Sequence, residues 1–179
     1  MESTFSIESD LISKPIVIFG SSRKDGETWK AVTSVFKSPD EIVSINLNEL
    51  KLSYFDYDQE NIDDHFLGVV EQMLNHKTII LATPVYWYSM SAIMKAFLDR
   101  WADLLISRKD LGRALKDRNL SVITSYANDA SGFETPFELT SKYLGMQYGG
   151  CFYYYSGGDL SIKAKNEDNA NDFRRKILG

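Results

Sequence analysis

Five short apolar segments alternate with segments of helical pattern along this chain of 179 residues. A run such as Thr78–Ala82, which is rich in β-branched residues, is typical of a strand buried on both faces. Strands that alternate with helices need crossover connections, which produce a parallel sheet with helices on both faces. The pattern therefore predicts an α/β fold with a doubly wound five-stranded parallel sheet, from strands at 15–20, 41–47, 77–83, 119–125 and 149–155 and helices at 28–37, 63–76, 91–106, 133–146 and 165–178.

The loop after the third predicted strand carries three aromatic rings. In open α/β sheets, ligands bind beyond the carboxyl ends of the strands, where this loop is expected to lie. Three rings at that edge predict a flat, π-rich ligand rather than a bare phosphate. The alternative is that the rings only cap the core at the end of the strand. The candidate binding residues of this loop are Pro84, Val85, Tyr86, Trp87, Tyr88 and Ser89.

The loop after the first predicted strand is rich in glycine and hydroxyl groups and opens a helix. Free backbone N–H groups and the positive end of the helix dipole make such a loop suitable for an anion. Serine and glycine are also common in any strand-to-helix turn, so this loop alone leaves phosphate binding open. Its candidate ligand-binding residues are Ser21, Ser22, Arg23, Gly26 and Thr28.

Several well-known phosphate-binding motifs are absent from the first loop. It lacks Gly-x-x-x-x-Gly-Lys-Ser/Thr, and Ser22 stands where Gly-x-Gly-x-x-Gly needs its second glycine. The loop holds no cysteine, which excludes a cysteine-dependent phosphatase. The third strand ends in Thr83-Pro84 rather than in an aspartate, which argues against a phosphoacceptor receiver domain.

Taken together, the two loops resemble those of the flavodoxin-like NAD(P)H-dependent FMN reductases and their quinone-reductase relatives. The resemblance covers roughly residues 14–155 and implies a flavodoxin-like fold with bound FMN. In that family the first loop holds the FMN phosphate, and the aromatic loop lies along the ribityl chain and the isoalloxazine ring. The matching residues are Gly20-Ser21-Ser22-Arg23-x-x-Gly26-x-Thr28, Thr83-Pro84-Val85-Tyr86-Trp87-Tyr88-Ser89-Met90-Ser91, Met94-Lys95 and Phe97-Leu98-Asp99-Arg100.

This chain departs from the family pattern in two loops. The family usually has asparagine before the threonine of the first loop, where this chain has Glu27, whose carboxylate is expected to weaken FMN binding unless it turns to solvent. Ser125 and Tyr126 lie where the third flavin loop of the family would be, and we include them among the cofactor-binding residues. The glycine-rich turn often found there is replaced by residues 127–132, Ala-Asn-Asp-Ala-Ser-Gly.

The resemblance implies an FMN-dependent oxidoreductase that passes hydride from NADH or NADPH to a small acceptor by a ping-pong route. Quinones, flavins, azo compounds and nitro compounds are the acceptor classes of such enzymes. Because FMN carries the chemistry, no catalytic side chain is expected. Two alternatives stay open: a non-catalytic electron carrier of the flavodoxin kind, and a protein that kept the fold but lost FMN.

Length and composition are consistent with one domain over residues 15–179, to which the resemblance assigns FMN binding. The preceding segment 1–14 is expected to be disordered or to add an edge strand. The net charge of −5 and the lack of a basic tract exclude an electrostatic nucleic-acid binder. We expect no metal site, because His65 and His76 are not spaced as ligands. The single Cys151 is interpreted as a small hydrophobic residue. Without a signal peptide or a membrane-length apolar stretch, a cytoplasmic protein is expected.

A homodimer is the expected assembly, with an interface at the predicted helix 91–106 and the flavin mouth. This expectation comes partly from the resemblance and partly from an apparent surplus of apolar side chains. The alternative is that these side chains pack on the sheet of the monomer. They are Met90, Met94, Trp101, Leu104, Leu105 and Ile106.

Four remaining interpretations are structural. Asp99 and Arg100 are expected to be scaffold residues with separate partners, and Tyr153–Tyr155 is expected to run from the fifth strand into a turn. The connection at 48–62 is interpreted as a loop over the sheet edge. The basic residues Arg174–Lys176 are expected to complement the dipole of a C-terminal helix rather than to bind a partner.

Overall fold

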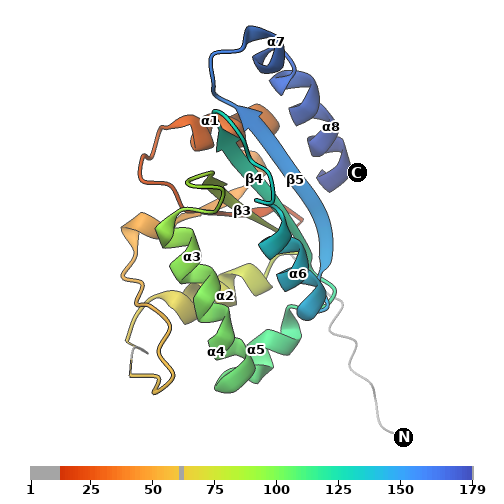
Figure 1. Ribbon diagram of the computed structural model, residues 1–179. Coiled ribbons are helices and arrows are strands. Elements are labelled where there is room, and N and C mark those ends of the chain that lie inside the picture. Colours follow the sequence, from red (N-terminus) through yellow and green to blue (C-terminus); the bar gives the residue numbers. More distant parts are fainter. Residues whose placement is uncertain (1–12, 61–62, 179) are drawn as a thin grey trace, which may run out of the picture.

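The protein forms a five-stranded sheet in which every neighbouring pair is parallel, in the order β2-β1-β3-β4-β5 (Figure 1). The computed structural model describes residues 13–60 and 63–178. The predicted fold class, a doubly wound flavodoxin-like sheet, is confirmed. Most of the expected segment 1–14 falls outside the described residues. The strands are β1 (Ile16–Phe19), β2 (Val43–Asn46), β3 (Thr78–Pro84), β4 (Asn119–Tyr126) and β5 (Gln147–Tyr155).

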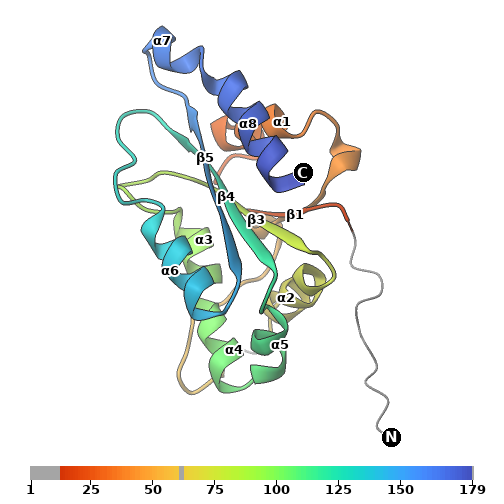
Figure 2. The same cartoon turned by 90° about the vertical axis from the view of Figure 1, so that its right-hand side faces the viewer.

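Helices cover both faces of the sheet. Figure 2 shows α1 and α8 on one side of the strands and α3 and α6 on the other. The helices are α1 (Glu27–Val35), α2 (Phe66–Leu74), α3 (Ala92–Asp99), α4 (Asp103–Ile106), α5 (Lys109–Ala114), α6 (Thr135–Tyr143), α7 (Leu160–Lys163) and α8 (Asn166–Leu178), with 3-10 turns η1 (Pro39–Glu41), η2 (Leu47–Glu49) and η3 (Arg100–Ala102).

Two separate hydrophobic cores follow from the two covered faces. Ile16 and Ile18 of β1 point into the larger core, whereas Val17 and Phe19 point into the smaller one under α1 and α8. Successive side chains of a strand face opposite ways, so a strand buried on both sides needs a continuous apolar run. This is why β1 and β3 were recognisable in the sequence.

The secondary structure differs from the prediction mainly in short elements. The predicted helix 91–106 is interrupted by η3, and the sequence analysis did not anticipate α5 and α7. The strand predicted at 41–47 begins later, because Pro39 starts η1 and the turn runs to Glu41. Helices of four to six residues show less than two turns of periodicity, so a pattern search has little to detect.

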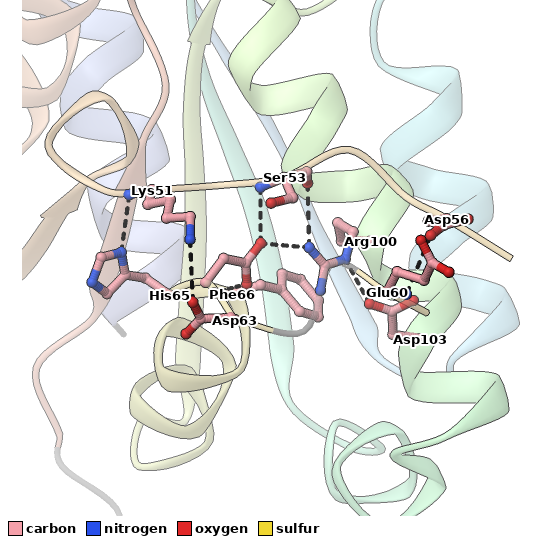
Figure 3. Close-up of polar contacts among 10 residues, drawn as sticks. Lys51, Ser53, Asp56, Glu60, Asp63, His65, Phe66, Arg100 and Asp103 are labelled. Carbon is pink, nitrogen blue, oxygen red and sulfur yellow. Dashed lines mark hydrogen bonds and ion pairs between the residues drawn. The ribbon is translucent and has the colours of Figure 1, made fainter. Parts of the chain in front are cut away.

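A buried arginine fixes the long connection between β2 and α2 (Figure 3). Arg100 of η3 donates through Nε to Asp103 and through Nη1 to Asp64, both at 2.6 Å. The same Nη1 donates to the carbonyl of Ser53 at 3.3 Å, and the guanidinium lies 4.7 Å from the ring centroid of Phe66. The connection between β2 and α2 is therefore held against α3 and α4. It does more than cover the sheet edge, which is the role the sequence predicts for residues 48–62.

Asp99 has a different partner from Arg100, which confirms that the two residues have separate partners. Its carboxylate accepts from Lys95 one turn earlier, at 2.5 Å. The interpretation of the basic C-terminal cluster was incomplete, because Arg174 donates to both carboxylate oxygens of Glu41 and to the carbonyl of Val35. Arg174 thus ties α8 to η1 and to the end of α1.

The proposed apolar surplus around α3 is mostly absent. Trp101 is only 3% exposed, and Met90, Met94 and Leu104 are equally buried in the larger core of the monomer. Only Leu105 and Ile106 of the six residues are exposed. The other four side chains are covered by the larger core of the same chain, without a second subunit. The interpretation of Trp101 as an interface residue was therefore wrong.

Three further findings concern the remaining expectations. Cys151 is half-buried and packs against the larger core, and its burial raises the pKa of the thiol well above the usual value. Tyr153–Tyr155 does continue β5 to its end. Among the described residues, no helix combines the length and the apolar character required to cross a membrane.

Candidate functional site

Three loops meet at the carboxyl edge of the sheet, and we call this region the three-loop edge: residues 20–28, 84–91 and 125–132. The N–H of Gly20 donates to the carbonyl of Ala82 at 2.8 Å, which joins the ends of β1 and β3. The hydroxyls of Thr28 and Ser125 lie 2.8 Å apart, and the N–H of Val85 donates to Ser125 at 2.9 Å. The candidate residues of all three loops are therefore brought together.

The first loop separates buried structural residues from exposed residues that are free to bind a ligand. Ser21 and Thr28 are buried, whereas Ser22 and Arg23 are exposed, and the structure gives their side chains no polar partner among the described residues. Helix α1 follows Gly26, an N-cap residue that gives no side-chain cap, and Trp29 donates its N–H to the carbonyl of Gly26 at 3.0 Å. The N–H groups of Glu27 and Thr28 make no backbone hydrogen bond to a described residue. This is the donor set that an anion requires.

An asparagine that the sequence analysis missed supports the first loop. The Nδ2 of Asn48 in η2 donates to the carbonyl of Ser21 at 2.6 Å. Glycine suits the start of the loop: a Cβ on Gly20 would lie 3.0 Å from Cε and 3.1 Å from Cβ of Met94, so Met94 would have to shift to admit a side chain there. No local sequence signal predicts the Asn48 contact, because it joins two separate connections.

The aromatic loop forms a tight two-residue turn. Tyr86 donates to the carbonyl of Ser89 at 2.8 Å and accepts from its N–H at 3.1 Å. Trp87 and Tyr88 occupy the two central positions with φ of 50° and 63°, a left-handed conformation that aromatic residues rarely adopt. Trp87 is 94% exposed, and Tyr86 and Tyr88 are about half exposed. The turn therefore presents rings to solvent and does not cap the core.

Two hydroxyls, which the sequence analysis did not select as site residues, hold the aromatic turn in place. Thr83 accepts from the N–H of Ser91 at 3.0 Å and donates to its hydroxyl at 3.1 Å. Ser91 in turn donates to the carbonyl of Gly20 at 2.6 Å and caps α3 by accepting from Met94. A serine just before a helical pattern is an N-cap signal, which could have revealed Ser91.

The third loop presents a tyrosine clamped by two others. The ring of Tyr126 meets Tyr153 and Tyr155 edge to face, with centroid distances of 6.0 and 5.4 Å. The hydroxyl of Tyr153 donates to Glu134 at the start of α6, at 3.0 Å. Burial raises the pKa of Tyr126, so its hydroxyl stays protonated at neutral pH. Residues 127–129 are exposed beside it.

Glu27 is turned along its helix and not into the first loop. Its carboxylate accepts from Lys30 at 2.6 Å, and this hydrogen bond raises the pKa of the lysine. The ion pair spreads the negative charge away from the anion site. The expectation that Glu27 disfavours FMN is correspondingly weakened. No group of His, Cys, Asp and Glu residues able to hold a metal ion occurs among residues 13–60 and 63–178.

The donor set fits a flavin monophosphate. Ser22, Arg23 and the first N–H groups of α1 can surround a terminal phosphate, while the turn of Tyr86–Ser89 offers aromatic faces along the same edge. Ser21, Gly26 and Thr28 shape the first loop, and Pro84 and Val85 place the turn. Thr28 and Ser125 are committed to each other, so they position the loops more directly than they contact an anion.

Comparisons with known proteins agree with the observed fold. A family model described as a flavodoxin-like fold matches residues 13–177. The "Putative NAD(P)H-dependent FMN-containing oxidoreductase YwqN" of Bacillus subtilis (strain 168) is 39% identical over 44 residues, which cover 25% of this chain and 24% of that protein. The alignment thus spans about a quarter of the curated relative.

Solved structures show the same fold. The Trp repressor binding protein from Bacillus subtilis is 22% identical with a TM-score of 0.70, over 89% of this chain and 96% of that chain. The FMN-dependent NADH-azoreductase from Bacillus anthracis, in complex with FMN, is 11% identical with a TM-score of 0.70, over 93% of this chain and all of that chain. From the match over residues 13–177, this chain belongs to the family with the flavodoxin-like fold.

Proposed function

We propose that this protein is an FMN-dependent NAD(P)H oxidoreductase that reduces a small acceptor such as a quinone, a flavin, an azo compound or a nitro compound. The observation that carries the proposal is the three-loop edge, where a loop with exposed Ser22 and Arg23 before an uncapped helix lies beside a strained turn of exposed aromatic residues. The names of the Bacillus subtilis relative and of the Bacillus anthracis azoreductase support the same activity.

The first loop predicts a preference for FMN over other flavins. Arg23 and Ser22 would hold the terminal phosphate with the N–H groups at the start of α1, whose dipole favours a negative charge. Riboflavin lacks that phosphate, and FAD would need space for a second phosphate and an adenosine. We therefore expect FMN to bind more tightly than either.

The aromatic turn and the third loop would hold the ring. The N–H groups of Val85, Tyr86 and Ser89 are already used within the protein. Those of Trp87 and Tyr88, with those at 127–128, make no backbone hydrogen bond to a described residue and remain available to the pyrimidine end of the flavin. Donors aimed at the position where charge develops favour the reduced ring.

When bound, FMN supplies the hydride and electron transfer chemistry itself. The protein contributes binding, orientation and the shape of the open face on which donor and acceptor stack in turn, which gives ping-pong kinetics. The half-exposed rings of Tyr86 and Tyr88 suit planar partners of this kind. No side chain of the three-loop edge needs to act as an acid or a base.

The visible spectrum of the purified protein tests the proposal. A bound flavin should give a yellow protein, and NADH or NADPH should bleach it without any partner protein. Steady-state oxidation of the nicotinamide with a quinone should follow, with parallel double-reciprocal lines. A yellow protein that nicotinamides do not bleach would indicate an electron carrier, and a colourless protein that does not quench FMN fluorescence would indicate a fold that lost FMN.

We also propose a cytoplasmic homodimer, with one domain per chain. The buried positions of Trp101 and Leu104 remove most of the apolar argument for it, so the proposal now rests on the exposed Leu105 and Ile106 and on the family resemblance. Sedimentation equilibrium at micromolar concentration decides the assembly. A mass near 20.4 kDa would show a monomer and reject the dimer.

A further inference from the structure

The first loop makes few hydrogen bonds of its own. None of the N–H groups of residues 21–25 donates to a backbone carbonyl in the described part of the chain. Within the loop, the N–H of Gly26 reaches the carbonyl of Arg23 only at 3.5 Å, a long distance for a hydrogen bond. A segment with so few internal bonds does not fix its own conformation, so contacts from neighbouring elements must hold it in place.

Two side chains of η2, the turn after β2, contact the first loop. The Nδ2 of Asn48 donates to the carbonyl of Ser21 at 2.6 Å, and the ammonium of Lys24 lies 3.0 Å from the carboxylate of Glu49. The ion pair is solvated, with side chains 82% and 58% exposed, so it contributes little to the order of the loop. Ser21 is only 5% exposed, which makes the bond from Asn48 the stronger restraint.

Asn48 is itself held in position. Its N–H donates at 3.1 Å to Oδ1 of Asn46, the N-cap residue of η2, and its Nδ2 reaches the same oxygen at 3.3 Å. Leu47, in the same turn, is fully buried in the larger core. Only the Nδ2 of an asparagine side chain can donate to a carbonyl, so the bond to Ser21 also fixes which way the amide of Asn48 faces. The restraint on the first loop is therefore anchored in the fold.

The peptide bond between Ser21 and Ser22 transmits this restraint to a free donor. The bond is trans, so its C=O and its N–H point in opposite directions. Because Asn48 holds the carbonyl of Ser21 toward η2, the N–H of Ser22 points away from η2. That N–H makes no backbone hydrogen bond to a described residue, as is also true of the N–H groups of Glu27 and Thr28 at the start of α1. A rotated peptide would turn the negative end of its dipole to that side.

We propose that Asn48 is a positioning residue for the phosphate of FMN, an inference that rests on the proposed function. By holding the carbonyl of Ser21, it orients the N–H of Ser22 toward the phosphate and keeps the carbonyl oxygen away from it. Asn48 does not contact the cofactor and acts only through the peptide between Ser21 and Ser22. A donor oriented in advance binds more tightly, because the cost of ordering the loop is met before the ligand arrives.

Fluorescence titration of the full-length Asn48→Ala protein with FMN and with riboflavin tests this role. The affinity for FMN should fall about tenfold, the usual effect of one lost hydrogen bond. The affinity for riboflavin should not change, because riboflavin has no phosphate. A second readout is the amide signal of Ser22 in the ¹H–¹⁵N spectrum. In the parent it should shift when FMN binds but not when riboflavin binds, and in Asn48→Ala the shift with FMN should be reduced.

The control Glu49→Gln changes the neighbouring residue of η2. It removes only the exposed pair with Lys24 and should leave the affinities for both flavins nearly unchanged. An equal loss of affinity for FMN and riboflavin in Asn48→Ala would show a general structural role and overturn the proposal. Unchanged FMN affinity in Asn48→Ala overturns it as well, while the proposed function stands because the parent binds FMN. A parent protein that binds neither flavin overturns the proposed function and this inference together.

Discussion

At the scale of single residues, the first loop divides its polar groups between structure and binding. Thr28 is buried and bonded to Ser125, and Ser21 is buried with its carbonyl held by Asn48. Ser22 and Arg23 are left exposed. Because a side chain that already has a buried partner gains little from a ligand, the affinity for a phosphate should depend on the exposed pair.

Arg23→Ala should therefore weaken FMN by about 1.5–3 kcal/mol, the usual contribution of a hydrogen bond to a charged group. Riboflavin, which has no phosphate, should bind both proteins equally. Lys24→Ala is a matched control in the same loop, since the ammonium of Lys24 pairs with Glu49 at 3.0 Å. Flavin fluorescence titration measures the affinity of the parent and of both variants for each flavin. An equal loss for FMN and riboflavin would contradict the assignment of Arg23 to the phosphate.

Glu27→Asn should tighten FMN by less than about 1 kcal/mol, because the removed charge is close to the phosphate but solvated and paired with Lys30. Substitution of Lys30, the partner of Glu27, provides the control for this prediction. In Lys30→Ala the carboxylate loses its partner, so FMN should bind more weakly than to the parent, and Glu27→Asn in that background should restore the affinity. A Glu27→Asn protein with weaker FMN binding would give Glu27 a constructive role.

At the scale of elements, the turn after β3 exposes aromatic rings to solvent in a backbone conformation that costs stability. Two non-glycine residues at positive φ cost of order 1 kcal/mol each, and the chain retains them at Trp87 and Tyr88. Strain of this kind persists where the surroundings enforce it, here through Thr83, Ser91 and the cap of α3.

Replacing the turn by Trp87→Asn/Tyr88→Gly should raise the free energy of unfolding by about 1 kcal/mol, since Asn-Gly is the preferred pair for this turn. The same variant should bind FMN more weakly and turn over more slowly, because two ring faces are lost. Urea denaturation and nicotinamide oxidation give the two readouts. A variant that is more stable and equally active would show that the rings do not serve the flavin site.

At the scale of the whole molecule, the Arg100 cluster links segments that are distant in the sequence. The side chains of Asp64, Arg100 and Asp103 are almost completely buried. Burial alone would raise the pKa of Asp64, but the N–H groups of Ser53 and Phe66, together with Arg100, hold it below the usual value. Stability from this carboxylate is therefore fully present above about pH 4 and is lost as the pH falls through its lowered pKa.

Asp64→Asn should lower the free energy of unfolding at pH 7 by about 3–5 kcal/mol, because Arg100 is left buried with a reduced counter-charge. It should also flatten the loss of stability below pH 4, since one depressed carboxyl no longer titrates. The control Asp99→Asn removes an exposed pair with Lys95 and should cost less than about 1 kcal/mol. Denaturant titrations at pH 7 and below pH 4 check the two effects. If the free energy of unfolding of the parent and of Asp64→Asn changed in parallel with pH, the assignment would be contradicted.

The sequence predicted some elements of the fold and missed others, and the difference has a physical reason. Buried parallel strands need unbroken apolar runs, so β1 and β3 were visible directly. The elements α5 and α7 are short and depend on close packing, as at Gly112, which has no local signature. The Trp101 interpretation failed because an amphipathic helix pattern indicates that a face is covered, but not whether the sheet of the same chain or a second subunit covers it.

The sequence by itself determined the α/β class, the parallel sheet and the loops in which a ligand site should lie, because these depend on local periodicity and on the geometry of crossovers. Only the tertiary structure decided which hydroxyls are free, which way Glu27 turns and that Trp87 and Tyr88 form a left-handed turn. It also decided that Arg100 holds the connection after β2. These features depend on contacts between residues far apart in the chain, and local propensity carries no record of such contacts.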